Sequence, residues 1–330
     1  MASAKRSQKH ITLDELEKRA REGDLGDADL RAYFKLDEDR SKPFAPALRI
    51  DYARVDTGGE KLSSEEVASL YEEAIRARQK KPPRTRFPET ARAAIAPAKV
   101  LAEGDSWFNL PDLLMPKDAI DFLRQSFNVS NLAMWGDTLE NMLAQKQYVQ
   151  MLESGNFRHF LFSGGGNDVL GSIGRYVKPR TPGDTDPAHA PDYVKPSFAV
   201  KVKAIVEEYE QVAEDTRNAG GARTVLYIHG YANAIPKPDG RYLGRRLTAL
   251  GFDPAVVGPL ASAIVAHMVA MFNQALQAFA ASQAHIVYLD LRPKVTARDW
   301  HTDEIHPNAN GARKISAAFA EAIDANMPVA

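Results

Sequence analysis

Short apolar runs alternate with longer amphipathic stretches over residues 99–325. The runs have the length of buried strands, and they cover residues 100–102, 129–133, 157–162, 224–228 and 286–289. Apolar residues at helical spacing predict helices over residues 118–125, 138–152, 198–217, 261–281 and 309–325. Alternating strands and helices need crossover connections, so we expect an α/β fold with a parallel sheet covered on both faces.

The first 95 residues follow another pattern. Thr12 with Glu15, and Ser63 with Glu66, have the spacing of a capping box, so each pair predicts the start of a helix. The second helix has an apolar face that should pack on something, made of Val67, Leu70, Tyr71, Ala74 and Ile75. Proline and glycine interrupt residues 41–61, which predicts an extended connector.

Charge separates the same two regions. Of residues 1–95, 38 are charged, against 47 of the 235 residues from 96 to 330. With few large apolar groups, residues 1–95 predict a helical, charged extension that leans on the main domain or on a protein partner. Residues 76–86 contain six basic residues without interleaved aromatic ones, so a solvated linker is favoured over a nucleic-acid or lipid contact.

Composition excludes several functional classes. The 42 basic and 43 acidic residues leave a net charge of -1, which gives no bulk attraction to nucleic acid or to a membrane. The absence of cysteine removes disulfides, thiol nucleophiles and cysteine-ligated metals. Residues 254–289 carry no charged side chain, but polar residues interrupt them, so a helix of a soluble core is expected, with no stable membrane insertion. Without a recognisable signal sequence, a cytoplasmic location is the default expectation.

Reactive residues follow four of the five apolar runs. Ser106 follows the first, Gly136 the second and Asn167 the third, while Asp303 and His306 lie in the loop after the fifth. Ligands of doubly wound sheets bind beyond the carboxyl ends of the strands, so these residues should converge. Each signal alone is weak, because an isolated serine of this kind is more often a helix cap.

Together the four blocks resemble the SGNH or GDSL hydrolase superfamily. They are Gly104-Asp105-Ser106, Gly136, Gly165-Gly166-Asn167-Asp168 and Asp303-Glu304-Ile305-His306. The resemblance spans about residues 99–325, and its one departure is Trp107, where the motif name has leucine. It implies a flavodoxin-like α/β/α sandwich whose five-stranded parallel sheet has the order 2-1-3-4-5. It also implies a serine ester hydrolase that needs no metal or organic cofactor.

The residue types suit that chemistry. A serine hydroxyl needs an imidazole to take its proton, and the imidazole needs a carboxylate to hold its tautomer, which assigns Ser106, His306 and Asp303 to a catalytic triad. The backbone N–H groups of Ser106 and Gly136 and the amide of Asn167 are candidates for the oxyanion hole.

Several alternatives stay open from the sequence. Glu304 or Asp299 could replace Asp303, although spacing favours Asp303. His301, His306 and Asp303 could bind a metal, but the segment lacks the H-E-x-x-H spacing and a third clear ligand. Asp105 and Asp168 are expected to fix loops rather than act as acids.

Residues beside the strand ends could shape a substrate pocket. Trp107, His229 and Tyr231 are the candidates, with packing in the core as the alternative reading. The proline-rich residues 171–196 have the length of a substrate-covering lid. The expected substrate is a small-molecule, lipid or acylated carbohydrate ester. An acyltransferase with the same triad, or an inactive binding module docked through residues 1–95, is the alternative.

Overall fold

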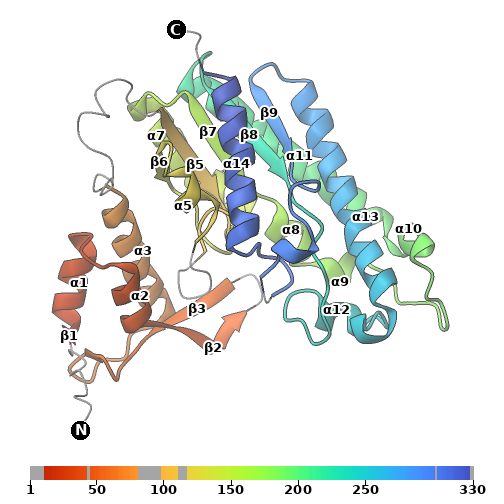
Figure 1. The fold of residues 1–330 in the computed structure, drawn as a ribbon, viewed down its shortest axis with the longest axis horizontal. Coiled ribbons are helices and arrows are strands. Elements are labelled where there is room, and N and C mark those ends of the chain that lie inside the picture. The colour runs from red at the N-terminus through yellow and green to blue at the C-terminus, as the bar shows by residue number, and fades with distance from the viewer. Residues whose placement is uncertain (1–10, 43–44, 81–97, 111–116, 302, 328–330) are drawn as a thin grey trace. The chain divides into compact units, whose positions relative to one another are not determined.

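The computed structural model describes residues 11–42, 45–80, 98–110, 117–301 and 303–327. These residues form two compact units, one up to residue 80 and the other from residue 98 (Figure 1). Residues 81–86 of the basic run, and with them most of the predicted linker, lie outside the described part.

The described residues of the N-terminal unit form three helices and four strands. They are β1 (Ile11–Thr12), α1 (Leu13–Arg21), α2 (Asp27–Tyr33), β2 (Phe34–Lys42), β3 (Ala45–Ile50), β4 (Val55–Asp56) and α3 (Ser64–Lys80). Both predicted helix starts are confirmed. Thr12 Oγ1 accepts the Glu15 N–H at 3.3 Å, and Ser63 and Glu66 exchange bonds of 2.7 and 3.2 Å.

The interpretation of residues 41–61 as an extended connector is wrong. Most of β3 pairs antiparallel with β2, with Phe34 opposite Ile50, and β4 pairs with β1. Phe34 and Ile50 are fully buried, and the Phe34 ring meets the ring of Tyr71 on α3 edge-on at 5.2 Å. The unit is therefore not purely helical, because a hairpin covers the predicted apolar face of α3.

All five apolar runs of the larger unit are confirmed as strands. They are β5 (Lys99–Gly104), β6 (Asn128–Asn131), β7 (His159–Ser163), β8 (Val225–Gly230) and β9 (Ile286–Asp290). The strands pair in parallel in the order β6-β5-β7-β8-β9, which is the expected order 2-1-3-4-5. The carboxyl ends of all five strands therefore lie along one edge of the sheet.

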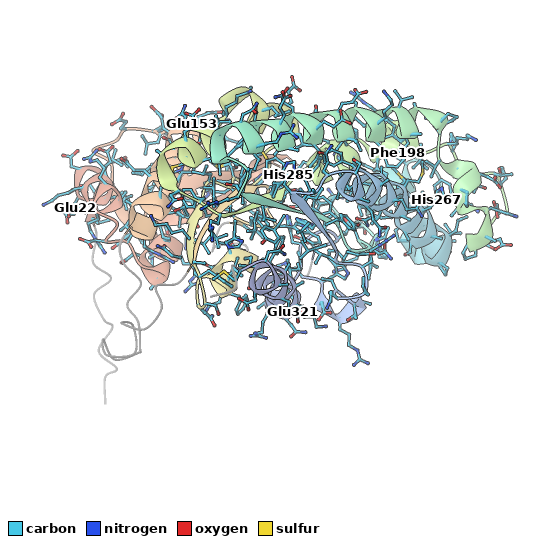
Figure 2. The ribbon with its side chains drawn as sticks, turned by 90° about the horizontal axis from the view of Figure 1, so that it is seen from above. Glu22, Glu153, Phe198, His267, His285 and Glu321 are labelled. Carbon is cyan, nitrogen blue, oxygen red and sulfur yellow. The ribbon has the colours of Figure 1, made fainter. Side chains whose placement is uncertain are left out.

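Helices cover both faces of this sheet, which confirms the α/β/α sandwich. On one face lie α6 (Leu139–Gln145), α7 (Gln147–Gly155), α11 (Pro196–Gly220) and α13 (Pro254–Ala281). On the other lie α5 (Ala119–Leu123) and α14 (Ala309–Ala325). Figure 2 shows Glu153 of α7 and Phe198 of α11 on one side of the sheet and Glu321 of α14 on the opposite side. The helix predicted over residues 138–152 is two helices, because Lys146 has a left-handed conformation (φ 49°) that ends α6.

The uncharged helix α13 packs on the sheet. It is the one helix among the described residues that is long and apolar enough to cross a membrane. Leu260, Ile264 and Met268 are nevertheless fully buried on the side that contacts β8 and β9. This packing agrees with the expectation of a core helix.

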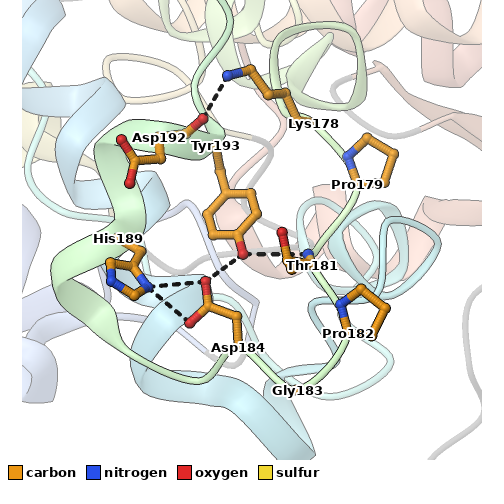
Figure 3. A pocket seen from close by; sticks show the side chains of 9 residues that line it. All are labelled: Lys178, Pro179, Thr181, Pro182, Gly183, Asp184, His189, Asp192 and Tyr193. Carbon is orange, nitrogen blue, oxygen red and sulfur yellow. Dashed lines mark hydrogen bonds and ion pairs between the residues drawn. The ribbon is translucent and has the colours of Figure 1, made fainter.

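The proline-rich residues 171–196 fold locally into short elements. These are α9 (Ile173–Tyr176), the 3-10 helix η1 (Pro187–His189) and α10 (Ala190–Tyr193). Figure 3 shows His189 and Tyr193, which both donate hydrogen bonds to the Asp184 carboxylate. These three residues line a hollow of about 650 Å³. Arg180 ties the segment to the Gly251 carbonyl at 2.7 Å. Its action as a lid stays a prediction.

Candidate active site

Ser106 lies in the turn that follows β5, an inner strand of the sheet. Gly104 ends this strand so close to β7 that a Cβ atom there would lie 2.6 Å from the Ser163 carbonyl oxygen. The Asp105 N–H donates to that same oxygen at 3.0 Å, and the Phe108 N–H closes the turn on the Asp105 carbonyl at 3.1 Å. Ser106 is thus presented at the carboxyl edge of the sheet, where it is 6% exposed.

Asp303 and His306 come from the loop after β9, two hundred residues along the chain from Ser106. Asp303 Oδ1 accepts the backbone N–H groups of Ile305 and His306 at 3.1 and 2.9 Å. Asp303 Oδ2 lies 2.6 Å from His306 Nδ1, and His306 Nε2 lies 2.9 Å from Ser106 Oγ. The structure therefore brings the three predicted triad residues together in hydrogen-bonding order.

The charge on Asp303 determines the tautomer of His306. Burial alone would raise the pKa of Asp303, but the hydrogen bonds that it accepts from His306 and Ile305, together with its attraction to the protonated form of the imidazole, outweigh burial and lower that pKa below its ordinary value. An ionised carboxylate only accepts, so His306 Nδ1 is the donor and Nε2 of the neutral ring has a free lone pair. Ser106 Oγ–H then donates to Nε2, which is the arrangement that a general base requires.

The alternatives to Asp303 have other partners. Glu304 accepts four backbone N–H groups of residues 237–244. Asp299 accepts from Lys314, Thr296 and Asn310, next to the start of α14. Neither carboxylate is bonded to the imidazole. No group of metal-ligating side chains is present among the described residues, although His301 Nδ1 lies 4.0 Å from Asp303 Oδ2.

The oxyanion-hole candidates follow three adjacent strands, β5, β6 and β7. Gly136 has φ +79°, a left-handed conformation that suits glycine. Within the described residues, the backbone N–H groups of Ser106 and Gly136 have no acceptor. Asn167 Nδ2 donates one hydrogen to the Asp137 carbonyl at 2.7 Å, which fixes its amide and leaves the second hydrogen for a ligand.

Asp105 lies under the serine turn in a network that the sequence did not reveal. It accepts the Trp107 N–H at 3.1 Å and the Ser163 hydroxyl at 2.8 Å on one oxygen, and the Tyr231 hydroxyl on the other. Burial raises the pKa of Asp105, against the lowering effect of these bonds. The hydrogen bond from the Trp107 backbone N–H agrees with the expectation that Asp105 fixes a loop. Its two side-chain partners come from β7 and from beyond β8, and no local pattern marks them.

Asp168 also supports a loop, as expected. It accepts the Leu139 N–H at 3.3 Å and pairs with Lys201 at 3.4 Å. These bonds link the Asn167 block to the start of α6 and to α11.

The three predicted pocket residues are largely buried and serve to hold the site. Trp107 Nε1 donates to the Ile305 carbonyl at 3.1 Å, which ties the serine turn to the histidine loop. His229 has no exposed surface and stacks on the Trp107 ring at 5.6 Å, which favours the alternative of a histidine packed in the core, while its contact with substrate stays a prediction. Burial lowers the pKa of His229 to about 4. Tyr231 is bonded to Asp105, and its contact with substrate stays a prediction.

A family comparison agrees with this geometry. Residues 108–319, close to two thirds of the chain, match the family described as GDSL-like Lipase/Acylhydrolase. The chain belongs to this family. The matched GDSL-like region begins two residues after Ser106 and includes Gly136, Asn167, Asp303 and His306. The N-terminal unit lies outside it.

Solved structures of GDSL-like and esterase proteins also resemble the chain. A lipolytic G-D-S-L family member from Veillonella parvula is 16% identical, with coverage of 69% of this chain and 98% of that one, and a TM-score of 0.42. A carbohydrate esterase family 3 protein from Talaromyces cellulolyticus is 15% identical (71% and 100% covered, TM-score 0.43). A carbohydrate acetylesterase from Sinorhizobium meliloti is 13% identical (70% and 100%, TM-score 0.44). No curated protein matches significantly.

Proposed function

We propose that this GDSL-family chain is a serine ester hydrolase that cleaves carboxylic esters through an acyl-enzyme on Ser106. The observation that carries the proposal is the position of His306, whose ring nitrogens lie 2.9 Å from Ser106 Oγ and 2.6 Å from Asp303 Oδ2. A buried imidazole between a hydroxyl and an ionised carboxylate is set up to move a proton.

Acylation uses the hydroxyl and the imidazole together. Ser106 Oγ attacks the ester carbonyl carbon while its proton passes to His306 Nε2, which gives a tetrahedral intermediate and an imidazolium. Asp303 accepts the Nδ1–H and stabilises that positive charge. When the intermediate collapses, the carbon–oxygen bond to the alcohol breaks, and the alcohol leaves with the proton from Nε2.

Negative charge on the former carbonyl oxygen needs donors that are already in place. The N–H groups of Ser106 and Gly136 and the second hydrogen of the Asn167 amide are the donors in this proposal. The Asp137 carbonyl holds the Asn167 amide before substrate arrives, so little reorganisation accompanies the reaction.

Deacylation repeats the same steps with water as the nucleophile. His306 removes a proton from water, the hydroxide attacks the acyl carbon, and collapse returns the proton to Ser106 Oγ. The products are a carboxylic acid and the regenerated enzyme. Every proton is held by a residue of the triad, so the scheme needs no cofactor.

A serine-reactive probe tests the nucleophile directly. Wild-type protein should be labelled by a fluorophosphonate and should hydrolyse p-nitrophenyl esters, and Ser106→Ala should abolish labelling and lower turnover by several decades. A series of acyl chain lengths beside acetylated sugars would define the substrate. Wild-type turnover in Ser106→Ala would refute the proposal, and transfer of the acyl group to an added alcohol in preference to water would make the enzyme an acyltransferase.

A further inference from the structure

The carboxylate of Glu304 is buried beside the triad and is enclosed by backbone N–H groups. Glu304 follows Asp303 directly and is 1% exposed. Its Oε1 accepts the N–H groups of Lys237 and Gly244 at 2.9 and 2.7 Å, and its Oε2 accepts those of Tyr242 and Leu243, both at 2.8 Å. Among the described residues, no cationic side chain forms an ion pair with it.

Residues 237–244 close around this carboxylate. A Cβ atom at Gly240 would lie 2.2 Å from the Glu304 carboxyl carbon, and one at Gly244 would lie 1.9 Å from the Lys237 carbonyl oxygen. Two bonds to each oxygen, at short distances, are the pattern of a strongly held anion. Burying a carboxylate without hydrogen-bond donors would cost free energy. The N–H groups of residues 237–244 therefore stabilise the buried carboxylate, and the carboxylate in turn holds this segment in place.

In a second set of hydrogen bonds, the roles are exchanged: a side chain of the segment binds backbone carbonyls of the loop that contains Glu304. The Lys237 ammonium donates to the carbonyl oxygens of His301 and Asp303, both at 2.9 Å. The Ile235 N–H donates to the Glu304 carbonyl at 3.3 Å. The loop that contains Asp303 and the segment 235–244 therefore hold each other through both side chains and backbone.

The segment also places an aromatic ring against the catalytic imidazole. The Tyr242 ring meets the His306 ring edge-on, with centroids 5.6 Å apart and planes at 86°. Tyr242 is buried, and its backbone N–H is one of the four that Glu304 holds. Two neighbours of Glu304 therefore contact His306: Asp303, which precedes it in the chain, and Tyr242, whose N–H it accepts.

We infer that Glu304 is a positioning residue of this active site: its carboxylate orders residues 237–244 so that the Tyr242 ring and Asp303 together hold the His306 imidazole toward Ser106. The inference deepens the proposed hydrolase function and rests on it. Tyr242 is the second positioning residue in this arrangement. Neither residue exchanges a proton or forms a bond with the substrate.

Because all four partners of the carboxylate are N–H donors, replacing one of its oxygens by a donor group tests their role directly. In Glu304→Gln the side chain keeps its size, but one oxygen becomes an NH2 group that faces two N–H donors. Two hydrogen bonds are lost and two donor pairs oppose each other. Glu304→Asp keeps all acceptor sites on a shorter side chain, so it should recover part of the loss.

Kinetics and NMR of the full chain test the inference. Glu304→Gln and Tyr242→Ala should each lower kcat by roughly a hundredfold, with a much smaller change in KM, because a small displacement of His306 slows proton transfer more than binding. The far-downfield proton signal of His306 Nδ1–H, identified by its loss in Asp303→Asn, should shift or broaden in both variants. The double variant should lose little more than either single one, because both act through the same ring.

Asp215→Asn is the matched control. The Asp215 carboxylate accepts from Tyr148 and Lys146 and ties α7 to α11, away from Ser106. It should lower Tm and leave kcat and the His306 signal unchanged. If Glu304→Gln and Tyr242→Ala behave in the same way, Glu304 has only a structural role and the inference is wrong. If Ser106→Ala keeps turnover, the hydrolase proposal fails instead, while the NMR signal still reports whether Glu304 positions His306.

Discussion

Asp303 holds His306 at two points, with Oδ2 on the ring Nδ1 at 2.6 Å and Oδ1 on the backbone N–H at 2.9 Å. The backbone bond fixes where the side chain starts, and the ring bond fixes its rotation and its tautomer. The two functions sit on separate oxygens, so a substitution can remove one and keep the other.

Asp303→Asn should separate tautomer control from loop structure. The asparagine oxygen can still accept the Ile305 and His306 N–H groups, while its NH2 would donate to Nδ1 and place the ring proton on Nε2. Such a ring cannot take the Ser106 proton, so kcat at neutral pH should fall by about 10⁴, with Tm nearly unchanged. Steady-state kinetics and thermal unfolding measure the two effects. A fall of less than tenfold would show that another group orients His306.

Asn167→Ala should remove a donor to the developing oxyanion. We expect kcat to fall by roughly a hundredfold to a thousandfold, with a smaller effect on KM, because the donor acts mainly in the transition state. Lys201→Gln is the control, since Lys201 pairs with the neighbouring Asp168 and should leave kcat unchanged. Equal effects of the two substitutions on kcat would contradict the oxyanion role.

Trp107→Phe should loosen the link between the serine turn and the histidine loop. The variant loses the indole N–H that donates to the Ile305 carbonyl. A buried carbonyl left without its donor costs about 1 to 3 kcal/mol of stability, and kcat should fall by about tenfold as His306 shifts. Trp300→Phe keeps a ring beside Trp107 and serves as the comparison in urea unfolding and ester turnover. Wild-type stability and turnover in Trp107→Phe would show that the link is dispensable.

His229 should make the protein less stable in mild acid. Its pKa in the folded chain is about 4, below the ordinary value of about 6.5, so unfolding takes up a proton between these values. Its stabilising contribution is complete above pH 6.5 and is lost as pH falls, by about 2 kcal/mol at pH 5. His229→Gln should reduce the stability difference between pH 7.5 and pH 5 by this amount in urea unfolding. If the stability difference between the two pH values is the same in the variant as in the wild type, a group other than His229 causes it.

The sequence predicted the sheet because its strands are buried on both faces. Such strands read as continuous apolar runs, and all five residues of β7 are buried. The hairpin of β2 and β3 carries no such signal, because six of the nine residues of β2 are charged. The pairing of Phe34 with Ile50 stabilises it, and that contact is not local in the sequence.

The triad was predictable from the order of its blocks, but its surroundings were not. The choice between Asp303 and Glu304 stayed open because adjacent residues point in different directions, and only the folded loop shows which one meets His306. Glu304 bonds to residues some sixty positions earlier, and no spacing rule links it to Tyr242 or Gly244. Likewise, His229 is packed against the rings of Trp107 and Phe319, and neither contact is local in the sequence.

Ser106 and His306 are two hundred residues apart in the chain, so the active site can form only after distant parts of the domain have folded together. The nucleophile follows β5, an inner strand of the sheet, while the base follows β9, a strand at the edge. A chain that has folded only as far as β8 has a serine turn but no base. Nucleophilic reactivity at Ser106 therefore requires that the loop after β9 has docked, so the gain of labelling during refolding would report when that loop reaches its native position.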